Sequence, residues 1–168
     1  MAGKNPNITY TSSLIGELKK HIAEKVLPLQ GRTFYVFDQD DMEAHLSNAT
    51  FPFVGVMFLG MEPVDADSGG NPARDLSRSS AVMQELHIAL VVVDSYPGAG
   101  IDTDNNSEIK HSITDLLDDT RHAMLGFQGT NKRPWRWSGE SPLPTSIRDA
   151  VMYSQQWRTK VVLRNIQQ

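Results

Sequence analysis

The stretch that decides the fold is MQELHIALVVVDSY, residues 83–96. Side chains alternate between the two faces of an extended chain, and one alternating set is entirely apolar: Leu86, Ile88, Leu90 and Val92. The other set starts with Glu85 and His87 and is apolar from Ala89 onwards. β-Branched residues crowd the second half, which favours a pleated strand over a helix. The stretch therefore predicts a strand near the middle of a sheet, covered fully on one face and partly on the other.

Apolar residues at helical spacing predict two main helices. The first begins at Ser12 or Ser13, either of which is a suitable N-cap, and ends at about Leu27. The second begins at Asn105 and ends at about Leu125. In both, charged side chains occupy the positions between the apolar ones, so each helix is expected to lie with one side on a core.

Four further strands are predicted, at residues 33–37, 53–59, 135–137 and 149–164. The last has the cleanest alternation in the chain, although its length exceeds that of most strands. Gly55 and Gly60 predict a bulge or a close approach of the backbone to a neighbour. Residues 138–144, rich in Ser, Gly and Pro, are interpreted as the connection between the last two strands.

These elements predict one domain, residues 1–168, of the α+β class. We expect a mostly antiparallel sheet of about four to five strands with two main helices packed on one face. Residues 1–11 are polar and are expected to form a flexible N-terminal arm. Residues 63–80 contain almost nothing to bury and are expected to form a long mobile loop, of the kind that is usually functional or disordered.

Composition narrows the class of protein. The chain has 168 residues, of which 39% are hydrophobic and 21% charged, as in a globular domain. A net charge of −4 argues against non-specific nucleic-acid binding, and the lack of cysteine removes disulfides and thiolate chemistry. The first residues contain no hydrophobic signal region, and no apolar run approaches the ~20 residues that span a bilayer. We therefore expect a protein of the reducing cytoplasm that binds no membrane.

Several groups of histidines and acidic residues could bind a metal ion, among them Asp102 and Asp104 in a polar loop. His111, Asp115, Asp118 and His122 share one stripe of the second predicted helix. Two imidazoles and two carboxylates suit a divalent metal, but the same spacing is typical of the solvated face of an amphipathic helix, which we favour. Another group is the acidic turn at 38–41, where Asp40 or Asp41 is expected to cap one or two helical turns ending at Leu46. We expect neither a metal nor a cofactor.

Catalytic motifs are also missing from the sequence. It contains no phosphate-binding glycine loop with Lys and Ser or Thr, no complete dinucleotide-binding glycine pattern and no serine nucleophile elbow. His87 lies within the central strand and is expected to be a hydrogen-bonded sheet residue rather than a base. Because nucleophile, base and orienting group never occur as a set, we expect that the protein is not an enzyme.

A row of cations occupies one alternating face of the last predicted strand: Arg158, Lys160 and Arg164. Arg136 joins this row from the neighbouring strand. Stacking of bases on Trp135 and Trp137 would turn the row into a single-stranded nucleic-acid site, whereas a solvated strand face with two core tryptophans needs no ligand. Among functional uses we favour a protein contact, because the face is small and the chain is acidic overall.

The order of elements resembles that of a bacteriophage tail-completion family, the tail terminators of long-tailed phages, including contractile ones. The resemblance is carried above all by PWRWSGESP at 134–142, followed by YSQQWRT at 153–159. It covers most of the chain, from the first helix to the last strand, and its motifs are structural. The N-terminal arm and the loop 63–80 follow the pattern least.

The resemblance implies a small subunit that closes into a homohexameric ring on the head-proximal end of the tail tube. Such a ring ends tube polymerisation and forms the attachment surface for the neck or head-completion protein and, in a contractile tail, for the sheath protein. The resemblance also implies that genomic DNA passes through the channel without sequence-specific binding and that the protein resides in the virion after assembly in the host cytoplasm. No catalytic or ligand-binding residue carries over.

The expected contact residues are Asp67, Arg74 and Arg78 in the loop 63–80 and Arg136, Arg158, Lys160 and Arg164 on the strands. A loop that orders when a neighbour arrives costs entropy that the contact must exceed. Three alternatives remain: another tail or neck protein such as a tube or connector subunit, a small metal-dependent hydrolase using the His111 stripe, and a single-strand nucleic-acid binder.

Overall fold

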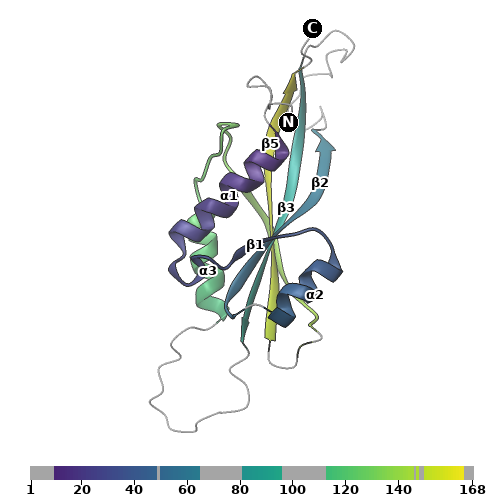
Figure 1. Cartoon of the computed structure of the whole chain (residues 1–168). Helices are drawn as coiled ribbons and strands as arrows, with labels where there is room; N and C mark the ends of the chain where they lie inside the picture. The colour runs from purple at the N-terminus through teal and green to yellow at the C-terminus, as the bar shows by residue number, and fades with distance from the viewer. Residues whose placement is uncertain are drawn as a thin grey trace, which may run out of the picture.

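The computed structural model describes residues 10–48, 50–64, 81–95, 113–145, 147 and 150–164, with no side-chain description at 81, 82, 163 and 164. The elements, in chain order, are α1 (Thr11–Lys25), the short 3-10 helix η1 (Leu27–Leu29), β1 (Thr33–Val36), α2 (Gln39–Asn48), β2 (Phe53–Pro63), β3 (Ala81–Ser95), α3 (Ile113–Met124), β4 (Arg136–Leu143) and β5 (Ala150–Arg164). Figure 1 shows them along the chain.

The described strands form one sheet in the order β1-β2-β3-β5-β4. β3 is therefore the middle strand, as predicted from residues 83–96. β3 pairs antiparallel with β2 on one side and with β5 on the other. β4 pairs antiparallel with β5, whereas β1 runs parallel to β2. The α+β class and the mostly antiparallel sheet are therefore confirmed.

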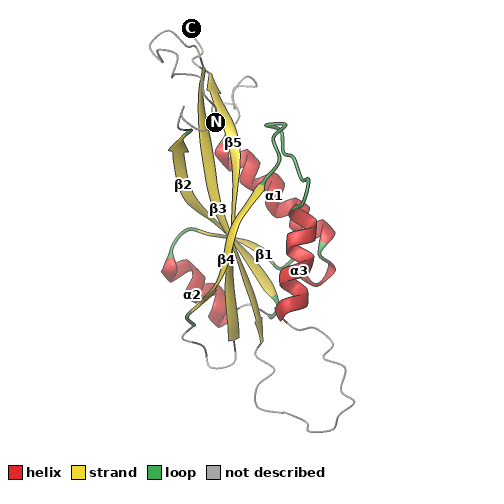
Figure 2. Cartoon of the chain, turned by 180° about the vertical axis from the view of Figure 1, so that it is seen from behind, coloured by secondary structure: helices red, strands yellow, loops and turns green. Residues whose placement is uncertain are grey.

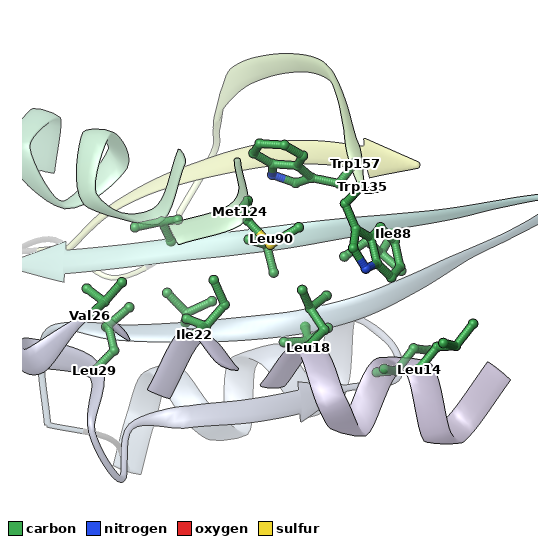
Figure 3. Packing of buried hydrophobic residues seen from close by; sticks show 14 of the residues in the cluster. Leu14, Leu18, Ile22, Val26, Leu29, Ile88, Leu90, Met124, Trp135 and Trp157 are labelled. Atoms are coloured by element: carbon green, nitrogen blue, oxygen red, sulfur yellow. The ribbon is translucent and has the colours of Figure 1, made fainter. Parts of the chain in front are cut away.

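Both main helices pack on one face of this sheet, as predicted (Figures 1 and 2). The alternating set Leu86, Ile88, Leu90 and Val92 is fully buried beneath them. Figure 3 shows Leu14, Leu18 and Ile22 of α1 facing Ile88 and Leu90, with Met124 of α3 in the same cluster. Burial of a side chain of this size stabilises the fold by about 1.5–3 kcal/mol, so this layer is the main source of stability.

A third helix, α2, lies on the opposite face and covers only the end of the sheet near β1 (Figure 2). There it buries the second set of β3 side chains, Ala89, Val91 and Val93, with Phe53 of β2. Close packing is possible because β2 has glycine at 55: a Cβ there would stand 2.5 Å from Val36 Cγ2 and 3.2 Å from Met42 Cε. Gly60 marks the bulge, where the register of β2 against β3 shifts. Both glycine predictions are confirmed.

Several local predictions were wrong. Residues 138–143, expected to be a connection, belong to β4, which continues past a bulge between Trp137 and Gly139 and pairs with β5 as far as Leu143. The first helix begins at Thr11, with Tyr10 at its N-cap. The cap of α2 is Asp38, whose Oδ1 accepts the Asp41 backbone N–H at 2.9 Å. The expected start of the second main helix at Asn105 lies outside the described residues.

Replacing Gly55 by alanine should destabilise the fold by about 1–3 kcal/mol, because the new methyl group overlaps a branched side chain in a packed layer. Gly16→Ala is the matched control. Its Cβ would meet only the Tyr35 hydroxyl, at 3.2 Å, and alanine favours the helix by about 1 kcal/mol over glycine. Chemical denaturation measures both. Equal stability of the two variants would contradict the close approach.

Candidate interaction surface

On the face of the sheet that α2 covers, the strands extend beyond the end of the helix. Strands β2, β3 and β5 run on beyond α2, and among the described residues no helix covers this half of that face (Figures 1 and 2). The strand register arranges its charged side chains in two rows. One row runs Glu62–Glu85–Lys160 across β2, β3 and β5, and the next runs His87–Arg158–Arg136 across β3, β5 and β4. We call these six residues the charged face.

The cations of this face are interleaved with carboxylates. Arg158 Nη1 donates to Glu85 Oε2 at 3.2 Å. His87 Nε2 lies 3.7 Å from Glu85 Oε2 and 3.8 Å from Glu62 Oε2, too far for a hydrogen bond. The predicted cations Arg136, Arg158 and Lys160 therefore share one face, but the prediction missed the carboxylates among them. The hydrogen bond expected at His87 is not made through Nε2.

Arg136 and Arg158 stand directly opposite each other on β4 and β5, as the alternation of the two strands predicts. Arg158 is paired with Glu85, whereas Arg136 and Lys160 form no ion pair with any carboxylate that the structure describes. Like charges directly opposite on neighbouring strands destabilise a sheet. Arg136 is exposed and therefore available to an outside partner.

The other predicted contact residues are not placed. Arg164 ends β5, and its side chain is not described. Asp67, Arg74 and Arg78, together with the rest of the loop from 65 onwards, lie outside the described residues. The same holds for the N-terminal arm as far as residue 9 and for His111 of the helical stripe.

The two tryptophans of 135–137 have different environments. Trp135 is buried in the core beneath α1, whereas Trp137 is 52% exposed. Stacking of bases on both is therefore excluded, and so is the interpretation of both as core residues. The third tryptophan, Trp157, lies opposite Trp137 in the register and is buried.

Asp118 and His122 of the predicted metal-binding stripe lie on α3 and contact other residues of the same helix. Asp118 Oδ1 pairs with Arg121 Nη2 at 2.8 Å, and His122 Nδ1 lies 2.9 Å from the Asp118 carbonyl oxygen. No three His, Asp or Glu side chains gather as metal ligands among the residues that the structure places. Likewise, no described helix is long and apolar enough to cross a membrane.

Sequence reasoning missed Glu62 and Glu85 as members of the surface. Glu85 shares the alternating set of His87, so its place could have been found from the sequence. Glu62 could not, because the bulge at Phe58–Gly60 changes which β2 side chains share a face with β3. No known protein family matches the sequence, and no curated protein matches it significantly.

Charge reversal at the two opposed arginines should have opposite effects on stability. Arg158→Glu removes the pair with Glu85 and sets a new carboxylate beside two others, which costs about 1 kcal/mol. Arg136→Glu instead creates an opposite-charge pair with Arg158 and should stabilise by a few tenths of a kcal/mol.

Urea denaturation of both variants checks this difference. It should shrink at about 1 M salt, where surface charges are screened over about 3 Å. Equal destabilisation by the two reversals, or a difference unaffected by salt, would contradict the arrangement of the charged face.

Proposed function

We propose that this chain is a virion structural protein, not an enzyme, that forms a hexameric ring on the head-proximal end of a phage tail tube. The ring ends tube polymerisation and offers the attachment surface for the neck or head-completion protein, and for the sheath if the tail contracts. The resemblance in residues 134–142 and 153–159 motivates the proposal. The structural observation that supports it is the charged face, which lies on a part of the sheet extending beyond its covering helix.

A face of this kind suits a protein partner better than a polyanion. Nucleic-acid affinity comes mainly from unopposed Lys and Arg that neutralise phosphates. Here Glu62 and Glu85 lie among the cations, and Glu85 already pairs with Arg158. Interleaved charges of both signs set partner choice and register in protein interfaces. The surface therefore favours contact with subunits of the tail over binding of the DNA that passes through the channel.

Ring formation requires two different patches on each subunit. In a head-to-tail contact, one surface of a subunit binds another surface of the next, and a suitable rotation closes the ring. Two surfaces of the described chain qualify by their exposure and composition: the apolar groove beside α2 and the exposed Trp137 at the start of β4, both described below.

Tails assembled without this protein test the proposal. If the ring terminates the tube, tubes formed in its absence should be overlong and should carry no head, as measured by electron microscopy of negatively stained lysates. Supplying the purified protein should restore tubes of uniform length. Absent tubes would instead identify a tube subunit, and tubes of normal length that fail to join heads would identify a connector.

Reversal of the three β5 cations, Arg158, Lys160 and Arg164, to glutamate should lower the yield of infectious particles by at least about tenfold, because it turns a mixed face into an acidic one. The matched control reverses Lys19, Lys20 and Lys25 on α1, with the same change in net charge. Circular dichroism confirms that both variants fold. A normal titre from a folded β5 variant, or equal losses in both, would count against a role of this strand in assembly.

A further inference from the structure

An apolar groove of about 540 Å³ lies between α2 and the adjoining ends of β4 and β5. Its apolar lining comes from Met42, Leu46, Met57, Leu143 and Met152. Methionine side chains are flexible and polarisable, so a groove lined by three of them adapts to an inserted aromatic group. The floor of the groove is the surface of the sheet beside α2. The helix does not cover this surface, so a side chain of another molecule can lie on it.

The rim of this groove is acidic. Asp38 and Glu43 line it, and Asp40 lies between them on α2. None of the three forms an ion pair with a cation that the structure describes. The groove therefore combines an apolar floor with uncompensated negative charge at its edge, and it fits a partner that presents an apolar group flanked by cations.

The chain itself presents such a group at the start of β4. Trp137 is 52% exposed, and Lys132 and Arg133, which come just before β4, are exposed too. Arg136 points the other way, because it pairs with Arg158 of the charged face, whereas Trp137 pairs with Trp157. Neither Lys132 nor Arg133 is paired with a described carboxylate. Tryptophan and arginine are the residues most enriched among those that dominate the energy of protein interfaces.

The two patches cannot meet within one chain. Trp137 stands at the start of β4 and Leu143 of the groove at its end, so six residues, or about 20 Å of extended strand, separate them. A contact between them must therefore join two copies. Because the patches differ, a pair of copies retains one free tryptophan and one free groove, and the contact repeats head to tail until it closes.

We propose that Trp137 of one copy inserts into the α2 groove of the next, with Lys132 and Arg133 facing the acidic rim of Asp38 and Glu43. This inference deepens the proposed function, since it specifies the contact that would build the ring. Insertion removes the exposed half of a large indole from water, and that burial favours association. The opposed charges orient the subunits as they approach.

Crosslinking tests the contact directly, because the chain has no native cysteine. A variant carrying both Arg133→Cys and Glu43→Cys, treated with a short bis-maleimide, should give a ladder of dimers, trimers and larger species on a denaturing gel. Either single variant should stop at dimers. The control double variant, Arg133→Cys with Glu24→Cys, uses an exposed α1 residue outside the groove and should give no ladder.

Two further variants show whether tryptophan and groove carry the contact. Trp137→Ala should weaken self-association by about thirtyfold or more, and Leu143→Arg should do the same by filling the groove. Equimolar mixing of the two should then restore one good interface and yield heterodimers by analytical ultracentrifugation, since one copy retains the groove and the other the tryptophan. Should Leu143→Arg fail to fold, Glu43→Lys serves as the groove variant.

Failure of this inference is distinguishable from failure of the proposed function. No ladder from the double-cysteine variant, or an equal ladder from the control, overturns the tryptophan–groove contact, whatever the tails look like. A ladder that Trp137→Ala abolishes supports the contact, even if tails assembled without the protein have normal length. Tails of normal length would contradict the role as a terminator but would not contradict the self-association.

Discussion

The structure depends on the pairing of β3 with its two neighbours. All fifteen residues of β3 pair with β5, and most of its length also pairs with β2. Since side chains alternate along a strand, a slip of one residue would turn Leu86, Ile88 and Leu90 away from the helices. Burial of these side chains by α1 and α3 therefore fixes the register, and the register fixes which side chains share each face.

The same register creates the charged face. Once Leu86 and Ile88 point towards α1, Glu85 and His87 must point the other way, next to Arg158 and Lys160 of β5. α2 covers that face only where its side chains are apolar, from Ala89 onwards. The change of composition along β3 thus divides one continuous sheet into a covered half that stabilises the domain and an open half that is free for contacts.

The exposed charges of the open half contribute little to folding. A pair such as Arg158–Glu85, with the arginine side chain 44% exposed, is worth about 0–1 kcal/mol at most. Such groups matter more for recognition, because their arrangement favours one partner and orientation over others. In the proposed ring, Lys132 and Arg133 before β4 and the carboxylates at the groove rim select the register of the contact, whereas burial of Trp137 supplies most of its energy.

The sequence by itself determined the elements with strong periodicity: α1, β3 and β5, the α+β class and the row of cations on β5. These are local patterns that burial on one face imposes. Most of β4 was not predicted from the sequence, because its Ser, Gly and Pro residues favour turns. Only pairing with β5 holds residues 138–143 in an extended conformation. Tertiary structure alone decided that Glu62 joins the charged face, that Trp135 is buried while Trp137 is exposed, and that α2 and β4 flank a groove. Each of these depends on contacts between residues far apart in the chain, which no local pattern encodes.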